Sequence, residues 1–208
     1  MTRHIIYDRE RILKTSWSIF LQKGFVSLHE ITAQEKFSPQ PIYSQFGSAD
    51  HLWQEVSNEM ATQIRNLCSK YLEANICPKH AMVNCCVIIY RCCHSYPGLF
   101  AALNNPKRNG RYLHQQIVNK LYDVLVHYIE AVPHDFKANF STILTLLVNY
   151  INCQKFFPIQ GEKNLRQYLR VQIDTLFEMD AEKCVNSRLL HPQKITSTNY
   201  QISNLMGF

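Results

Sequence analysis

Residues 38–48 read SPQPIYSQFGS, and this stretch decides how the N-terminal part of the chain folds. Ser38 and Pro39 predict the start of a helix, because serine is a good N-cap and proline suits the first helical position, where no backbone N–H is needed. The Gly-Ser pair that follows Phe46 predicts an early end to this helix. Ile42 and Phe46 are four residues apart and predict one buried face, so the polar side chains between them face outward.

Two further short helices are predicted upstream of this stretch. The first spans Arg9–Lys23, where apolar residues return at helical spacing and Gly24 provides a stop. The second spans Ser27–Glu35, in which Ser27 and Glu30 fit a capping box, an arrangement where each side chain satisfies a free backbone donor. Three short helices with short connections favour a helix-turn-helix over the wall of a helix bundle.

The rest of the chain is also predicted to be helical. Asp50 or Ser48 is expected to cap a fourth helix that runs to about Leu72, and longer apolar helices follow Pro78 without any sustained β-type alternation. The expected spans are Lys79–Ser95, Gly98–Leu103, Arg111–Val132, Asp135–Phe157 and Glu162–Met179. The predicted fold class is all-α, with a helix-turn-helix unit at 1–52, a helical domain at 53–180 and a polar tail at 181–208.

Composition restricts the class of protein. The 208 residues are 46% hydrophobic with few glycines and prolines, which is enough to bury a core. The net charge of +6 suits an anionic partner, but residues 1–52 hold six Lys/Arg against five acids, so charge alone does not locate a nucleic-acid site. We find no signal peptide, and no run reaches the ~18 apolar residues of a membrane span. We therefore expect a cytoplasmic protein with no membrane partner.

Four of the eight cysteines, Cys85-Cys86 and Cys92-Cys93, lie on one predicted helix. The two pairs are separated by ~10.5 Å along a helix axis, too far for one Zn ion or for an intrahelical disulfide. We interpret them as small buried apolar residues in a reduced protein, with a thiol sensor or soft-metal site as the alternative. No metal or cofactor is predicted. The sequence lacks a Gly-rich phosphate loop, H-E-x-x-H and G-x-S-x-G, which argues against an enzyme.

The first quarter of the chain resembles the N-terminal pattern of the TetR (tetracycline-repressor) family. The matching positions are Ile12-Leu13, Ile19-Phe20, Gly24-Phe25, Ile31, Ser38, Ile42-Tyr43, Phe46, Ser48, Asp50 and Leu52. The sequence departs from the pattern where the family's Ala-Gly turn reads Glu35-Lys36, and where its Ser-Lys-Glu reads Ser48-Ala49-Asp50, without the phosphate-binding lysine.

This resemblance implies a one-component, ligand-responsive transcriptional regulator, expected to be a repressor, that binds a palindromic DNA operator as a homodimer. A recognition helix enters the major groove by its N-terminal end, where glutamine can pair with adenine, and Tyr43 resembles the family's phosphate-contacting tyrosine. A structural Tyr43 and ordinary surface glutamines are the alternatives. The expected DNA-binding residues are Lys36, Ser38, Pro39, Gln40, Pro41, Tyr43, Ser44, Gln45 and, in an N-terminal arm, Arg3.

The resemblance also implies that the helical domain binds an effector and dimerises. A pocket for a hydrophobic or aromatic small molecule is expected among Met82, Cys86, Ile89, Tyr90, Phe100, Leu103, Tyr112, Ile117, Leu121 and Phe140, with simple core packing as the alternative. The last two long helices are expected to pair with a second subunit through Ile143, Leu146, Leu147, Tyr150, Ile151, Leu169, Ile173 and Leu176. The alternative function is a TetR-like protein-interaction adaptor with weakened or lost DNA binding.

Overall fold

The computed structural model describes residues 8–72, 77–105, 107–128, 136–154 and 161–177. Within these ranges the chain forms nine helices and no strand, so the prediction of an all-α fold is confirmed. The helices are α1 (Arg9–Lys23), α2 (Leu28–Glu35), α3 (Gln40–Phe46), α4 (Ala49–Ser69), α5 (Pro78–Ser95), α6 (Pro97–Leu103), α7 (Arg108–Tyr128), α8 (Phe136–Gln154) and α9 (Gly161–Phe177). The helix ends expected at Val132, Phe157 and Met179, and the tail at 181–208, lie outside the described residues.

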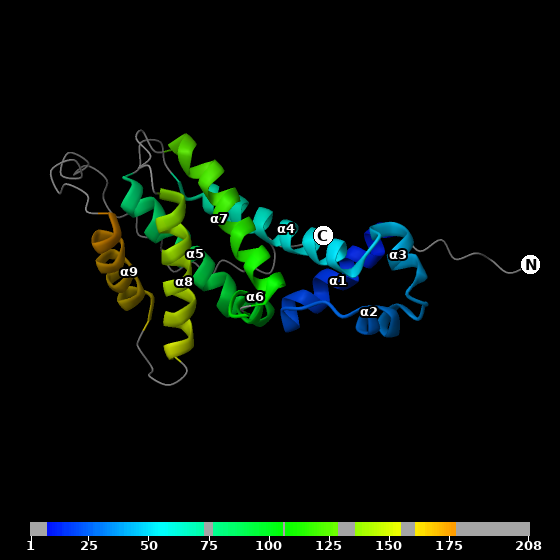
Figure 1. Ribbon diagram of the computed structural model, residues 1–208. Helices are drawn as coiled ribbons and strands as arrows, with labels where there is room; N and C mark the ends of the chain where they lie inside the picture. The colour runs from blue at the N-terminus through cyan, green and yellow to red at the C-terminus, as the bar shows by residue number, and fades with distance from the viewer. Residues whose placement is uncertain (1–7, 73–76, 106, 129–135, 155–160, 178–208) are drawn as a thin grey trace, which may run out of the picture.

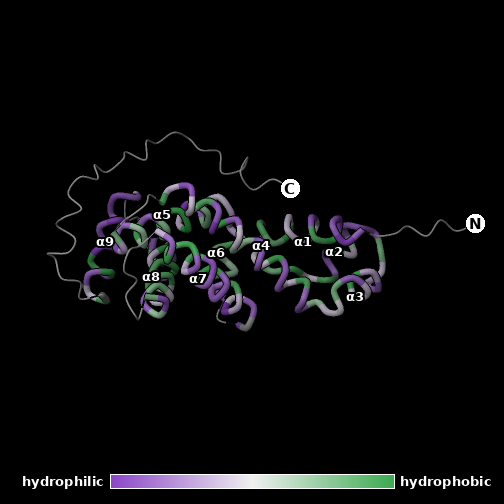
Figure 2. The backbone as a smooth tube through the Cα atoms, turned by 90° about the horizontal axis from the view of Figure 1, so that it is seen from above, coloured by the Kyte–Doolittle hydropathy of each residue, from purple (hydrophilic) through white to green (hydrophobic). Residues whose placement is uncertain are grey.

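The molecule is elongated, with α1, α2 and α3 at one end and α8 and α9 at the other (Figure 1). The fourth helix belongs to both parts, because α4 contacts α1 and α3 as well as α5 and α7. The boundary expected between residues 52 and 53 therefore lies inside a continuous helix. Hydrophobic stretches run along α5 and α8, as the tube in Figure 2 shows. Among the described residues no single helix is long and apolar enough to cross a membrane, and α5 and α6 reach that composition only as a bent pair.

Two of the predicted helix ends are confirmed. Gly24 ends α1 in the left-handed conformation, with φ of 78°, and its N–H donates to the Phe20 carbonyl oxygen at 2.8 Å. Ser48 caps α4, because its Oγ accepts a hydrogen bond from the His51 N–H at 3.1 Å. Both signals are local, and each satisfies a backbone group that the helix end would otherwise leave unpaired.

The capping box expected at the start of α2 is wrong. The Ser27 side chain makes no capping hydrogen bond, and the Glu30 carboxylate instead pairs with Lys23 at the end of α1. The physical reason is competition: a lysine from the neighbouring helix offers Glu30 a charged partner in place of a backbone N–H. The pair holds the first turn of α2 against the last turn of α1.

The helix-turn-helix unit meets the helical domain where α1 and α6 cross at two glycines. A Cβ atom on Gly98 would lie 1.8 Å from the Phe20 carbonyl oxygen and 2.6 Å from the Gly24 nitrogen. A Cβ atom on Gly24 would lie 2.3 Å from the Gly98 carbonyl oxygen. The two backbones therefore approach at a distance that only glycine permits.

The apolar faces of α8 and α9 point into the protein's own core. The residues expected at a dimer interface are buried in one protomer, namely Ile143, Leu147, Tyr150, Ile151, Leu169 and Ile173, while Leu146 and Leu176 are half-buried against the core. The reason is that α8 packs on α5, α7 and α9 of the same chain. Side chains buried in this way do not form the exposed face that the dimer prediction requires.

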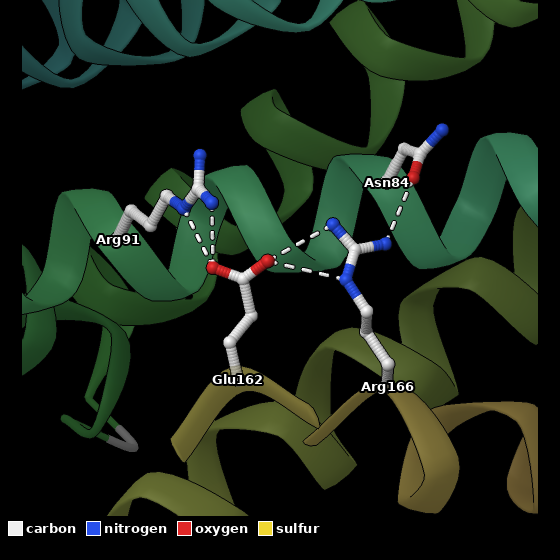
Figure 3. Close-up of polar contacts among 4 residues, drawn as sticks. All are labelled: Asn84, Arg91, Glu162 and Arg166. Carbon is white, nitrogen blue, oxygen red and sulfur yellow. Dashed lines mark hydrogen bonds and ion pairs between the residues drawn. The ribbon is translucent and has the colours of Figure 1, made fainter. Parts of the chain in front are cut away.

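A shared carboxylate joins α5 to α9. Arg91 of α5 donates from Nε and Nη2 to Glu162 Oε2 at 2.9 and 2.6 Å (Figure 3). Arg166 donates from Nε and Nη2 to Glu162 Oε1 at 3.1 and 3.0 Å, and from Nη1 to Asn84 Oδ1 at 3.1 Å. Because both carboxylate oxygens accept charged donors, this cluster holds α9 on α5 more firmly than an isolated surface ion pair would.

Replacing Glu162 by glutamine should loosen α9 in a pH-dependent way. Burial raises the pKa of Glu162, but the hydrogen bonds and charge of Arg91, followed by those of Arg166, outweigh it, so the pKa lies below its ordinary value. A carboxyl group with a lowered folded pKa adds stability above its unfolded pKa and loses it as the pH falls through the folded pKa. After allowance for solvent screening, we expect Glu162→Gln to lower the free energy of unfolding by about 1 kcal/mol near pH 7 and by much less below about pH 4.

Urea unfolding followed by circular dichroism measures this difference at both pH values. Asp123→Asn, which removes an exposed carboxylate of α7, is the matched control and should leave stability nearly unchanged at both. If Glu162→Gln lowers the free energy of unfolding by the same amount at both pH values, the charge of the carboxylate is not what holds α9.

Replacing Gly98 by alanine tests the crossing of α1 and α6. Alanine favours a helix interior over glycine by about 1 kcal/mol, so without the close approach the variant would be more stable than the wild type. The added methyl group meets backbone atoms, which cannot rotate away. We therefore expect the free energy of unfolding, measured with urea, to fall by about 1–3 kcal/mol. Gly161→Ala is the matched control, because a Cβ there meets nothing within 4 Å and only the positive φ of 74° adds strain. A stabilised Gly98→Ala variant would overturn the close approach.

Candidate nucleic-acid interface

An apolar cluster holds α1, α3 and the start of α4 together. Ile42 and Phe46 of α3 are buried, as are Phe20 of α1 and Trp53 of α4. The rings of Phe20 and Trp53 meet edge to face with centroids 5.5 Å apart. Arg9 covers the Phe46 ring, with its guanidinium carbon 5.1 Å from the ring centroid. Burial of one side of α3 fixes which side is left to face a partner.

Glu35 is the last residue of α2 and Lys36 is the cap that opens the turn to α3, at the positions where the TetR pattern has alanine and glycine. The Glu35 side chain is 8% exposed and accepts hydrogen bonds from Arg11 Nε and Thr15 Oγ1, so it ties α2 to α1. Lys36 adopts the left-handed conformation, with φ of 57° and ψ of 43°. A side chain in this conformation costs about 1–2 kcal/mol. The turn therefore keeps its shape with different residues, at some cost in strain.

The third helix begins one residue later than expected. Pro39 occupies the cap position of α3, with φ of −61° and ψ of −16°, and has no side chain able to cap the helix. The N-cap role expected for Ser38 is therefore wrong, because proline already sets a helical φ before the first helical residue. Ser38 is exposed and lies in the connection between α2 and α3.

The outer face of α3 is polar and uncharged. Gln40, Ser44 and Gln45 are exposed, Tyr43 is 46% exposed, and Pro41 is half-buried. Ser44 Oγ donates to the Pro41 carbonyl oxygen at 3.0 Å, so its hydroxyl remains available chiefly as an acceptor. This face lies opposite Ile42 and Phe46, which the core holds. The structure thus brings the predicted residues of α3 onto one exposed surface, which Lys36, Ser38 and Pro39 extend, while Arg3 lies outside the described residues.

Three of the five Lys and Arg side chains that the structure describes in residues 8–52 are paired with acids. The pairs are Arg9 with Glu55, Arg11 with Glu35 and Lys23 with Glu30. Within the part of the chain that the structure describes, Lys14 and Lys36 are exposed and have no ion pair. Lys14 was not among the residues selected from the sequence, although its place on the polar face of α1 could have indicated it. Few free cations imply that hydrogen bonds and apolar contacts must carry a larger share of any DNA affinity.

The residues expected to line an effector pocket lie among α5, α6, α7 and α8. Those that are buried are Met82, Cys86, Ile89, Leu103, Ile117, Leu121 and Phe140, whereas Tyr90, Phe100 and Tyr112 are half-buried. Two surface hollows have other linings: one lies along the end of α4 and the other between α5 and α9. An effector pocket at the expected residues stays a prediction.

The four cysteines of α5 are all buried, at Cys85, Cys86, Cys92 and Cys93. Burial raises the pKa of the Cys92 thiol to about 12. Cys68 of α4 is hydrogen-bonded to Cys85, and burial raises its pKa well above the ordinary value. No group of three or more His, Cys, Asp or Glu side chains is arranged to hold a metal ion in the described ranges. Buried thiols with raised pKa values are unreactive, which favours the interpretation as core residues.

No protein-family model matches the sequence, and no curated protein matches it. Solved structures match the fold. A TetR transcriptional regulator from Rhodococcus sp. RHA1 aligns over 81% of this chain and 94% of its own, with a TM-score of 0.57 and 16% sequence identity. A TetR-family regulator from Streptomyces coelicolor aligns over 90% and 89%, with a TM-score of 0.60 and 12% identity.

A third structure, a putative TetR-family regulator from Mesorhizobium loti MAFF303099, covers 81% of this chain and 94% of its own, with a TM-score of 0.51 and 16% identity. The class is therefore an all-helical protein with an N-terminal helix-turn-helix. More specifically, the chain has the fold of the TetR-family transcriptional regulators, and the fold implied by the sequence resemblance is confirmed.

Proposed function

We propose that the protein is a transcriptional regulator, acting as a repressor, that binds a palindromic DNA operator as a homodimer. The observation that carries this proposal is the outer face of α3, where Gln40, Tyr43 and Gln45 are exposed on a helix whose other face is fixed in the core. Exposed amide side chains at the start of such a helix suit base edges in the major groove, and the Tyr43 hydroxyl suits a phosphate.

DNA binding should depend on Gln40 and Tyr43. A duplex selected from a random pool by the full-length protein provides the DNA, and fluorescence anisotropy measures the affinity. Gln40→Ala should cost about 1–3 kcal/mol on the selected duplex and relax its sequence preference, because an amide that pairs with a base carries specificity. Tyr43→Phe should weaken binding to all duplexes alike, because a phosphate contact carries no sequence information.

Gln115→Ala is the matched control, since Gln115 is an exposed glutamine on α7, away from α3. It should bind as the wild type does. A pool from which no duplex is enriched, or equal affinity of the Gln40 and Tyr43 variants and the wild type, would contradict DNA binding and favour the adaptor function.

We place the dimer interface on the outward faces of α8 and α9. Along the whole of α8 the only charged residue is Lys137 in its first turn, although Thr142, Thr145 and Asn149 are exposed. On α9, Val171 is 55% exposed, a high value for a large apolar side chain. A surface without charge, such as the exposed side of α8, is typical of interface centres, and Val171 offers an apolar contact beside the charged residues of α9, so these faces suit a second copy of the chain.

Charged residues introduced on these faces should separate the subunits. The double variant Asn149→Glu and Val171→Glu places two pairs of like charges near a two-fold axis, and we expect it to be a monomer at micromolar concentration in sedimentation velocity, with unchanged helicity. Gln22→Glu, on the exposed side of α1, is the control and should remain dimeric. A wild type that sediments as a monomer would exclude this interface, and so would a double variant that remains dimeric.

We further propose that a hydrophobic or aromatic effector acts through the helical domain and that α4 transmits its effect. The support is that α4 packs along α7, with Trp53 Nε1 donating to the Asn109 carbonyl oxygen at 3.3 Å, while the same Trp53 ring touches Phe20 of α1. A ligand that separates residues around α7 would move α4 and, with it, α1 and α3. Such a ligand regulates only if it binds the DNA-competent and DNA-incompetent conformations unequally.

A further inference from the structure

A hollow of about 210 Å3 lies between α5 and α9. Its lining residues come from the first turns of α5 and the second half of α9, and they are Lys79, His80, Val83, Arg170, Ile173 and Asp174. At about 30 Å3 per water molecule, this volume equals roughly seven waters. It has room for a phosphate ion or a small carboxylic acid. None of the residues expected to bind DNA or an apolar effector belongs to it.

Positively charged side chains outnumber negatively charged ones where α9 packs on α5. Glu162 is shared by Arg91 and Arg166, and Asp174 pairs with Lys79, so both acids are already neutralised. Arg170 has no hydrogen-bond or ion-pair partner among the described residues, and neither has His80. The hollow therefore presents one unused guanidinium and one imidazole beside an ammonium group.

We propose that this hollow binds a small oxyanion, a phosphate or carboxylate group, through Arg170, Lys79 and His80. A guanidinium offers two parallel N–H donors that match two oxygens of either group, and the Lys79 ammonium has donors left after it pairs with Asp174. Val83 and Ile173, which are buried, form the floor. An apolar floor lowers the local dielectric constant and strengthens an ion pair made above it. A cation would be repelled, since the one carboxylate of the lining is already paired.

His80 gives the site a pH dependence of defined sign. Burial lowers the pKa of His80, and the charges of Arg170 and Lys79 lower it further, with Asp174 as the one acid in the lining. A bound anion offsets this repulsion and raises the pKa of His80, so binding takes up a proton. For benzoate, whose charge stays constant in this range, affinity should therefore increase as the pH falls from about 8 to about 6.

Isothermal titration calorimetry on the full chain tests the site with inorganic phosphate in one arm and benzoate in the other. The wild type should bind at least one of them saturably, and the preferred arm identifies the oxyanion. Arg170→Gln should weaken this binding about tenfold or more, since hydrogen bonds to charged groups are the strong ones. Lys163→Gln is the matched control, because it removes the same charge from an exposed position of α9 outside the hollow. It should change the affinity less than about twofold.

The His80 imidazole resonance, assigned with His80→Gln, should titrate at higher pH when the anion is present. The proposal is overturned if neither anion binds saturably below about 10 mM, if Lys163→Gln weakens binding as much as Arg170→Gln, or if the His80 titration does not shift. None of these measurements includes DNA. Failure here therefore leaves the proposed DNA binding intact, and failure of DNA binding leaves this site intact.

Discussion

The close approach of Gly24 and Gly98 is the contact on which the arrangement of the whole molecule depends. It brings the end of α1 against α6 without intervening side chains, so the helix-turn-helix unit is packed on the helical domain and is not joined to it by a chain alone. The continuous α4 makes the second junction, because Trp53 touches Phe20 on one side and the Asn109 carbonyl on the other. Two junctions on different helices define both the position and the orientation of α3.

The helix-turn-helix could be predicted from sequence because its signals are local. Gly24 and Ser48 end or begin a helix through backbone groups within a few residues, so no knowledge of the rest of the fold is needed. The same reasoning was wrong for Glu30, whose partner Lys23 belongs to another helix. The role of Glu35 also depends on a tertiary contact, since Arg11 lies in α1 and no periodic pattern links the two positions. Local rules did not include these competing partners.

Apolar periodicity predicted which faces of α8 and α9 are buried, but not what buries them. Ile143 and Leu169 have the spacing of an interface helix, and a stripe of that kind packs equally well on its own chain or on another. The structure assigns both to the core. For the interface that we propose on the exposed side of α8, the signal in the sequence is the absence of charged residues along this helix after Lys137. A search for apolar stripes does not detect such a signal. For the hollow between α5 and α9, the sequence alone had no signal, because Lys79 and Arg170 come together only when α9 packs on α5.

The length of α4 has a mechanical consequence. Its 21 residues at about 1.5 Å each make a rod of about 31 Å, so a tilt of only about 5° about one end displaces the other by nearly 3 Å. That displacement is as large as the whole length of a hydrogen bond. A small tilt of this one helix is therefore enough to displace one end of the molecule relative to the other, without unfolding and without a large domain motion. A small change of angle at one end of a stiff helix becomes a displacement at its other end. The stiffness that makes this possible comes from the regular backbone hydrogen bonds of α4 itself.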